Sequence, residues 1–326
     1  MKRTIAIIGG GDSSEYEESL SSAKGIYSFF DKEKYNVYVV KIVNQSWTVL
    51  LNFDEKLGAD NPAIEEVAVD KNDFSFTVDN HRVIFDYAYI TIHGEPGEDG
   101  CLQGYFKIMN IPHSTCDVLP ASLTYNKHFC SQYLKGFGVN IAESIILKQK
   151  KDPSFSLDEV KRRVGYPCFV KPNLGGSSFG ITKVKQEEDL IPAIEKAFSE
   201  DREVIIEAFL DGMEVTCGCF AIKNEMVALP LTEVVTHKEF FDFEAKYKGA
   251  VDEITPARIS ETLTHHIQDL TKMIYRLLNC DGIIRIDYIV TESDKVNLLE
   301  VNTTPGMTST SFIPQQVSAA GLSMRQ

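Results

Sequence analysis

Two apolar runs near the C-terminus, DGIIRIDYIV and KVNLLEVN, constrain this chain more than any other feature. They flank the polar TESDK and therefore predict an antiparallel hairpin. Side chains alternate along a strand, so Glu300 and Asn302 share one face. If the turn spans 292–295, Asp287 lies opposite Glu300 and Arg285 lies opposite Asn302. The hairpin is expected to gather two carboxylates, an amide and a guanidinium on one face of a sheet.

Such a group of oxygen atoms suits Mg²⁺ or Mn²⁺ held together with substrate phosphates. A purely structural network of ion pairs is the alternative, because such networks also cluster charges. Asn302 favours the metal site, since an amide adds an oxygen ligand without adding charge. Asp287, Glu300 and Asn302 are therefore the candidate metal ligands.

The stretch FVKPNLGGSSFGITKV predicts a strand, a glycine-rich loop and a second strand. Backbone N–H groups in such a loop can hold phosphates, with Lys171 at the end of the first strand as a point charge. It is not a Walker A loop, because no G-K-[ST] follows and the loop leads into a strand. An ordinary flexible hairpin is the alternative, but together with the metal face the loop favours ATP as a ligand.

The N-terminal third alternates strands and helices, which indicates an α/β domain. TIAII and YNVYVVKIV are read as strands and EYEESLSSAKGIYSFF as the helix between them. The turn GGGDSSEYEESL resembles a dinucleotide-binding turn, but Ser14 stands where the third glycine belongs. An NAD(P)-binding oxidoreductase is therefore a weak alternative. Glu15 is either a first-turn acid or the partner of a substrate ammonium group.

RVIFDYAYITIHG is read as one further strand, followed by the loop HGEPGEDGCLQG. His93 stands at the end of that strand, where open α/β sheets bind ligands. Glu98 and Asp99 are expected only to cap the following helix.

Later segments complete the outline. SLTYNKHFCSQYLKGFG is read as one helix, and SETLTHHIQDLTKMIYRLLN as an amphipathic helix. Residues 236–256 lack periodicity and are expected to form a long loop, which in a compact domain is often functional. Within it Lys246 and Tyr247 are candidates to close over an anionic ligand, with a solvated loop as the alternative.

Composition excludes several classes. The net charge of −14 argues against general nucleic-acid binding and against an anionic membrane surface. No run approaches a membrane span, and TIAII is too short for a signal peptide. Seven cysteines without a C-x-x-C pair indicate reduced thiols and a cytoplasmic protein. Cys217 and Cys219 are expected to pack in the core rather than bind a metal.

Five ordered motifs resemble those of the D-alanine–D-alanine ligases of the ATP-grasp superfamily. They are GGxxxxExExSL with Glu15, HGxxGEDGxxQG from His93 to Gly104, VKPxxxGSSxG from Val170 to Gly180, EAKY from Glu244 to Tyr247, and RID with EVNTTPGMTSTS. The resemblance runs from about Ile5 to Met324. It implies a three-domain ATP-grasp fold with an α/β N-terminal domain (1–118), an α+β central domain (119–213) and a C-terminal domain (214–326). ATP would bind between the last two.

The resemblance also implies an activity. Two D-alanines would be joined through a D-alanyl phosphate, with ATP consumed, to make D-alanyl-D-alanine for peptidoglycan. The enzyme would be a cytoplasmic homodimer using two Mg²⁺ or Mn²⁺ ions. The alternative is a depsipeptide ligase that takes D-lactate as second substrate. Tyr247 directly after Lys246 favours the dipeptide.

Residue roles follow from the same resemblance. Glu15 would bind the first D-alanine's ammonium group, linked through Ser177 to Tyr247, and His93 would lie near that substrate. Arg285 and the Gly306 N–H would bind the oxyanion. Ser311 would help to bind the second carboxylate. The two metal ions would be held by Asp287, Glu300 and Asn302. The expected ATP contacts are Lys127, Lys171, Glu207, Phe209, Leu210, Glu214 and Lys246.

Two positions depart from the motifs. Glu18 stands before Ser19 where an apolar residue is usual, which adds an acid near the N-terminal site. Gly175 stands where an acid is common, and the phosphate loop is expected to be looser for it.

Overall fold

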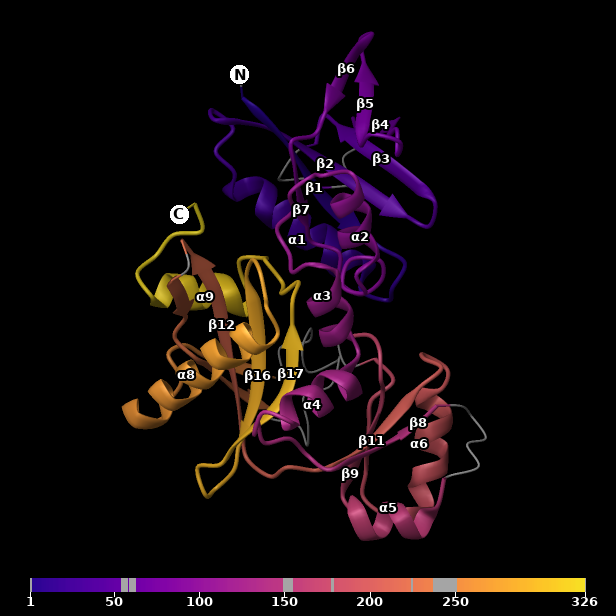
Figure 1. The fold of residues 1–326 in the computed structure, drawn as a ribbon, viewed down its shortest axis with the longest axis vertical. Coiled ribbons are helices and arrows are strands. Elements are labelled where there is room, and N and C mark those ends of the chain that lie inside the picture. The colour runs from indigo at the N-terminus through magenta and orange to yellow at the C-terminus, as the bar shows by residue number, and fades with distance from the viewer. Residues whose placement is uncertain are drawn as a thin grey trace.

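The computed structural model describes residues 2–53, 58, 63–148, 155–176, 179–223, 225–236 and 251–325. Its strands form three main sheets and one separate hairpin, which confirms the predicted mixture of strands and helices. In Figure 1 the first sheet occupies the top of the molecule, and the other two lie side by side below it.

The first sheet belongs to the N-terminal part and has the strand order β4-β3-β2-β1-β7. Strand β1 is central and parallel to both neighbours, with the predicted helix α1 (Tyr16–Phe29) crossing between β1 and β2. Helix α2 (Cys101–Ile108) follows the last strand. The strands are β1 (Arg3–Gly10), β2 (Tyr35–Val43), β3 (Ser46–Leu51), β4 (Glu65–Ala68) and β7 (Tyr87–Ile90).

The prediction of one strand over RVIFDYAYITIHG is wrong. The segment forms β6 (His81–Ile84), which pairs with β5 (Ser75–Val78), and then β7 in the main sheet. The break lies at Asp86, whose N–H donates to the Thr4 carbonyl (2.8 Å) and whose Oδ2 accepts from the Thr4 N–H (2.7 Å). These two bonds take the chain from the hairpin into the sheet.

The second sheet is antiparallel, with the order β10-β9-β11-β8. Its elements are β8 (Ser144–Leu147), α5 (Leu157–Arg163), β9 (Cys168–Pro172), β10 (Thr182–Val184), η1 (Glu187–Asp189), α6 (Leu190–Ala197) and β11 (Val204–Ala208). The single helix predicted before it is wrong, since α3 (Val118–Tyr125) and α4 (Lys127–Lys135) are separate. Asn126 divides them, because its extended backbone ends α3 while its side chain caps α4 by accepting from the Phe129 N–H.

The third sheet contains the predicted hairpin and has the order β15-β14-β12-β16-β17, with β13 on β12. Its elements are β12 (Met213–Ile222), β13 (Glu225–Ala228), β14 (Thr232–Thr236), β15 (Val251–Ile254), α8 (Glu261–Leu277), β16 (Ile284–Val290), β17 (Val296–Asn302) and α9 (Phe312–Ala319). The loop expected over 236–256 is partly wrong, because 251–254 pair with β14 as a strand. Residues 237–250 lie outside the described part of the chain.

The predicted hairpin register is confirmed. Asp287 is the cross-strand partner of Glu300 and Arg285 that of Asn302, with one irregularity after Asp287. Cys217 and Cys219 are fully buried in the core between the third sheet and α8, as expected. All seven cysteines are free thiols.

Each sheet draws its strands from one stretch of chain: 3–90, 144–208 and 213–302. We propose the domain ranges 1–118, 119–213 and 214–326 on this basis. In the described part of the chain no helix is both long and apolar enough to cross a membrane.

Helix α9 is fixed to the third sheet by one buried side chain. The Gln316 Oε1 accepts from the Gly218 N–H (2.8 Å), and its Nε2 donates to the Thr216 carbonyl (3.0 Å) and to Thr232 Oγ1 (3.1 Å). Gln316 is fully buried. Replacing it with leucine removes this partner from the Gly218 N–H and the Thr216 carbonyl in the core, and leaves Thr232 Oγ1 with its bond to Thr255 Oγ1 (2.6 Å).

We expect Gln316→Leu to lower the free energy of unfolding by about 2–4 kcal/mol. Urea unfolding measures this loss, and Ser318→Ala, at an exposed position of the same helix, should unfold like the wild type. Equal stability of the Gln316→Leu and Ser318→Ala variants would contradict the anchoring role.

Candidate active site

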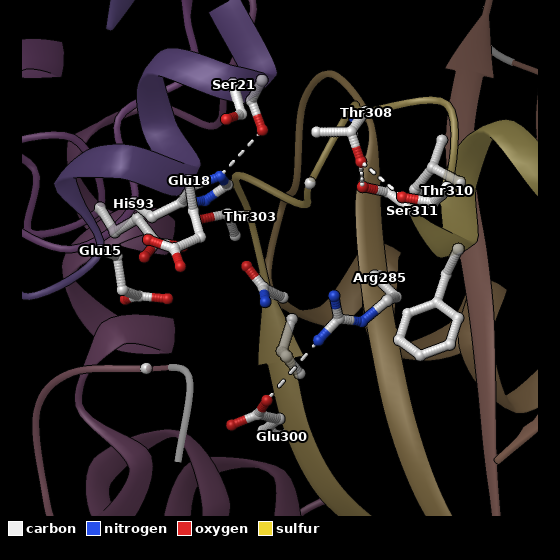
Figure 2. Close-up of a pocket in the computed structure, with 18 of the residues that line it drawn as sticks. Glu15, Glu18, Ser21, His93, Arg285, Glu300, Thr303, Thr308, Thr310 and Ser311 are labelled. Carbon is white, nitrogen blue, oxygen red and sulfur yellow. Dashed lines mark hydrogen bonds and ion pairs between the residues drawn. The ribbon is translucent and has the colours of Figure 1, made fainter. Parts of the chain in front are cut away.

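One cleft of about 1110 Å³ collects residues from all three parts of the chain. Glu15 and His93 enter from the N-terminal sheet and its helix, Lys127 and Gly176 from the central part, and Arg285 from β16. Figure 2 shows Glu15, Glu18 and His93 on one side of the cleft and Arg285, Glu300 and Ser311 on the other. Most predicted site residues that the structure describes therefore line one space.

Arg285 is the centre of the C-terminal wall. Its Nε and Nη2 donate to the two carboxylate oxygens of Asp287 (2.9 and 2.8 Å), and Nη2 lies 3.7 Å from Glu300 Oε1. Burial opposes the charged form of Arg285, but the neighbouring Asp287 and Glu300 outweigh it and raise the pKa. The guanidinium is a permanent buried cation. Within the described residues its bonds run from Nε and Nη2, which leaves Nη1 for an oxygen in the cleft.

The Asn302 amide completes this wall. In the orientation that satisfies both its ends, the nitrogen donates to Glu98 Oε1 (3.0 Å) and the oxygen accepts from Arg285 Nη2 (3.2 Å). Asp287, Glu300 and Asn302 thus surround Arg285 on one face, as the strand periodicity predicted.

The prediction that Glu98 merely caps a helix is wrong. Helix α2 has Gly100 at its N-cap without a side-chain cap, whereas Glu98 lines the cleft and accepts from the Gly94 N–H (2.7 Å). Asp99 does serve the helix start, since its Oδ1 accepts from the Cys101 N–H. Burial, followed by the charge of Glu15, raises the pKa of Glu98 to about 8. The carboxyl keeps its proton near neutral pH in the ligand-free chain.

This raised pKa predicts a pH-dependent stability. Between the ordinary glutamate pKa of 4.5 and about 8, the unfolded chain releases the Glu98 proton while the folded chain retains it. The unfolded state then binds fewer protons, so the free energy of unfolding falls as pH rises through this window.

Glu98→Gln removes the effect. In metal-free buffer we expect it to raise stability at pH 8 relative to wild type by about 2–3 kcal/mol, discounted for the partial exposure of the side chain, and to leave the two alike at pH 4.5. Urea unfolding across this pH range tests it. Parallel stability curves for the two proteins would contradict the raised pKa.

The oxygens on this face fit a divalent cation that is also bound by phosphates. The Glu300 side chain is 30% exposed to the cleft, and each Asp287 oxygen accepts one bond from Arg285 and keeps a lone pair. In the ranges that the structure describes, no three His, Cys, Asp or Glu side chains form a closed cage. Mg²⁺ commonly takes one or two protein carboxylates and completes its shell with phosphate and water, and Asp287 and Glu300 are the two carboxylates on this face.

The glycine-rich loop approaches Glu15 closely. A Cβ on Gly176 would lie 2.6 Å from Glu15 Oε2, so a larger residue there would have to displace the Glu15 carboxylate from its place in the cleft. Gly175 has a φ of +97°, which disfavours the acid common at that position. Lys127 donates to the Gly175 carbonyl and ties this loop to α4. Glu15 itself is buried and makes no cap bond to α1, which favours its role in the cleft over that of a first-turn acid.

The expected nucleotide contacts lie on and after β9 and β11. Lys171 Nζ donates to Glu207 Oε2 (2.5 Å), so the buried Lys171 is paired with a half-buried carboxylate. Lys183 Nζ lies 3.8 Å from the centre of the Phe209 ring, and Leu210 follows directly. Glu214, on β12, lies close enough to raise the pKa of Arg285. The ATP roles of these residues stay predictions.

The turn after β17 forms the remaining wall. Gly306, Thr308, Thr310 and Ser311 line the cleft, and Ser311 Oγ bonds to the Thr308 N–H (3.1 Å) and hydroxyl (2.8 Å). Phe312, at the start of α9, stacks with its ring centre 5.3 Å from the Arg285 guanidinium carbon. The roles of Gly306 and Ser311 in binding stay predictions.

Sequence reasoning missed several cleft residues. Glu98 lies inside the motif HGxxGEDGxxQG but was interpreted as a helix cap. Phe312 directly follows the motif EVNTTPGMTSTS. Asp252 and Glu253 also line the cleft, but they fell in a segment read as loop. Ser177, Lys246 and Tyr247 lie outside the described residues.

Comparisons with known proteins agree with this arrangement. The family model described as "D-ala D-ala ligase N-terminus" matches residues 4–116, and "D-ala D-ala ligase C-terminus" matches residues 133–326. The chain is 60% identical over 325 residues to a D-alanine–D-alanine ligase of Bacteroides fragilis strain YCH46, covering 100% of this chain and 97% of the relative. It is 53% identical to that of Porphyromonas gingivalis strain W83, covering 100% and 95%.

Solved structures of the same kind superpose over nearly the whole chain. The VanG D-Ala:D-Ser ligase of Enterococcus faecalis has a TM-score of 0.87 at 32% identity, covering 100% of this chain and 97% of that one. D-alanyl-alanine synthetase A of Vibrio cholerae O1 has a TM-score of 0.84 at 27% identity, covering 99% and 95%. These matches leave no support for an NAD(P)-binding oxidoreductase. The fold is the predicted ATP-grasp fold, and the chain belongs to the D-alanine–D-alanine ligase family.

Proposed function

We propose that this chain joins two D-alanines into D-alanyl-D-alanine for peptidoglycan synthesis, consuming ATP through a D-alanyl phosphate. One observation carries the proposal. Arg285, which is held by Asp287 on the third sheet, faces Glu15 and His93 of the N-terminal part across the cleft. A buried cation opposite a buried carboxylate is complementary to an amino acid, whose two ends bear opposite charges.

The first step is phosphoryl transfer. A carboxylate oxygen of the first D-alanine attacks the γ-phosphorus of ATP, and the bond to the leaving ADP oxygen breaks. Two anions must approach each other, so cations have to neutralise their charge. Lys127, Lys171 and Lys246 are the proposed phosphate ligands, and Glu207, Phe209, Leu210 and Glu214 would bind the nucleoside.

Asp287, Glu300 and Asn302 would hold the two divalent ions. When bound, Mg²⁺ or Mn²⁺ supplies charge neutralisation and orientation of the phosphates. The protein's own contribution is the arrangement of this wall, because Arg285 bonds both Asp287 oxygens and so fixes the orientation of that carboxylate.

The second step is acyl transfer. The free amine of the second D-alanine attacks the acyl carbon, the carbonyl oxygen gains the negative charge, and phosphate leaves as the amide forms. The Nη1 of Arg285 and the Gly306 N–H would bind that oxyanion. Glu15 would hold the ammonium group of the first D-alanine, and Ser311 would help to bind the carboxylate of the second. Ser177 would link Glu15 to Tyr247, and the loop that carries Lys246 and Tyr247 would close the cleft against water, which otherwise hydrolyses the acyl phosphate.

The test is ADP release from the purified chain with a panel of amino and hydroxy acids. We expect strong stimulation by D-alanine alone and weak stimulation by L-alanine. D-lactate and D-serine are each added with D-alanine to examine the second position. A predominant ester product near neutral pH would replace the dipeptide assignment with the depsipeptide one, and a D-alanine-independent ADP release would remove both.

We further propose a cytoplasmic enzyme, which the seven free thiols support. The homodimer implied by the resemblance is proposed as well, and sedimentation of the purified chain would measure it.

A further inference from the structure

Helix α1 contacts the turn that carries Gly306 through two residues one helical turn apart. The Met307 N–H donates to Ser22 Oγ (3.3 Å), and a Cβ on Gly25 would lie 2.5 Å from the Met307 carbonyl oxygen. Residues three apart share a helix face, so α1 touches both the N–H and the carbonyl of Met307. Ser22 and Met307 are both buried.

Ser22 also bonds to a residue of the first sheet. Its Oγ lies 3.1 Å from Nε2 of His93, and the dashed line from His93 in Figure 2 marks this bond. A backbone N–H is only a donor, so Ser22 must accept from Met307. The Ser22 hydroxyl still has one proton and one lone pair, so it can donate to His93 Nε2 or accept from it, depending on the His93 tautomer. In the arrangement in which Ser22 donates, the ring proton of His93 lies on Nδ1, and the NMR experiment below distinguishes this arrangement from the reverse one.

The same turn is confined from its other side. A Cβ on Gly306 would lie 2.9 Å from Ser311 Oγ, so Gly306 packs closely against the Ser311 hydroxyl and directly precedes the Met307 N–H that bonds to Ser22. The Gly306 N–H lies in the peptide plane before Gly306, and the φ and ψ angles of Gly306 relate that plane to the Met307 peptide that bonds to Ser22. The Ser22 hydroxyl on α1 is therefore linked to the orientation of the Gly306 N–H, although the two residues lie more than 280 positions apart in the sequence.

We propose that Ser22 is a positioning residue that couples His93 to the Gly306 turn, so that the first-substrate site and the oxyanion donor form one unit. The proposal rests on the proposed ligase function of this cleft. Ser22 acts through His93 and Met307, and Gly25 supports it by leaving room for the Met307 carbonyl. A purely structural bond would stabilise the protein without controlling the His93 tautomer or the rate.

The experiment compares full-length Ser22→Ala with Ser28→Ala. Ser28 is exposed on the same helix, and its hydroxyl donates to the Gly25 carbonyl (2.6 Å). Ser28→Ala therefore removes a serine hydroxyl from α1 without removing a bond to His93 or Met307. Nitrogen-15 NMR of histidine-labelled protein at pH 8 reports the tautomer, and His93→Gln assigns the signal. We expect Nδ1–H for His93 in wild type and Ser28→Ala, and a shift toward Nε2–H in Ser22→Ala.

Kinetics provide the second readout. Ser22→Ala should lower kcat for dipeptide formation about tenfold, because a misplaced oxyanion donor weakens transition-state binding, while the KM for ATP stays within about twofold. Gly25→Ala should lower kcat as well, although alanine favours a helix. The double variant should lose less than the product of the two single losses, because both changes displace one turn.

The NMR measurement needs no turnover. The proposed ligase function and the positioning role of Ser22 can therefore be contradicted independently of each other. A wild type without D-alanine-dependent ADP release would overturn the proposed function. An Nε2–H tautomer in the wild type, or a Ser22→Ala variant that matches Ser28→Ala in both tautomer and kcat, would overturn the positioning role.

Discussion

Arg285→Lys is expected to lower kcat/KM for dipeptide formation by about 10²–10³-fold. Lysine keeps a positive charge beside Asp287 but loses the fork that bonds both carboxylate oxygens (2.9 and 2.8 Å). In the wild type, Nε and Nη2 are held by Asp287 and Nη1 is left for an oxygen in the cleft. Lysine has no group that corresponds to Nη1. The charge remains, but the oriented oxyanion donor does not.

The measurement is steady-state dipeptide formation at saturating ATP. Arg276→Lys, the same change at an exposed position of α8, is the matched control and should be as active as wild type. Thermal unfolding of Arg285→Lys should show a folded protein, because Asp287 retains a cationic neighbour. Activity of Arg285→Lys within about threefold of wild type would remove Arg285 from the reaction.

Glu300→Gln is expected to lower kcat/KM for ATP by about 10³-fold at ordinary Mg²⁺ concentration. The substitution conserves shape but removes the most exposed carboxylate on the Arg285 face, with its side chain 30% exposed against 8% for Asp287. An amide binds a hard cation more weakly than a carboxylate. The activation curve should therefore move to higher Mg²⁺ concentration.

The assay is ADP release against Mg²⁺ and then Mn²⁺, with Glu292→Gln as the control. Glu292 is an exposed acid in the turn of the same hairpin, so its variant should retain the wild-type curve. The metal dependence is the specific readout for Glu300→Gln, whereas Arg285→Lys, which also releases the Asp287 carboxylate, is compared by its kcat at saturating Mg²⁺. An unaltered Mg²⁺ curve for Glu300→Gln would rule out a metal-binding role.

The C-terminal hairpin could be predicted because its determinants are local. Strand periodicity and a short polar turn set the register that pairs Asp287 with Glu300. The oxidoreductase alternative was weak for an equally local reason, the missing glycine at Ser14. Sequence patterns within one hairpin were thus sufficient to predict that Arg285, Asp287, Glu300 and Asn302 share one face of the sheet.

Contacts between distant segments could not be predicted in this way. Glu98 was read as a helix cap because its partner Asn302 comes from another sheet. The bond from Met307 to Ser22 joins residues 285 positions apart. The division between α3 and α4 was missed because Asn126 both continues a polar, helix-compatible pattern and caps the second helix. In each case the side chain's role is decided by what packs against it.

In the proposed reaction this cleft activates the carboxylate of one D-alanine by phosphorylation. D-alanine labelled with oxygen-18 in its carboxylate tests it most directly, with phosphorus-31 NMR of the phosphate released by the wild-type chain. The attacking carboxylate oxygen stays on phosphorus when the acyl C–O bond breaks. If D-alanyl phosphate is the intermediate, we expect one labelled oxygen in the inorganic phosphate for each dipeptide formed. Dipeptide formed together with unlabelled phosphate would exclude that intermediate.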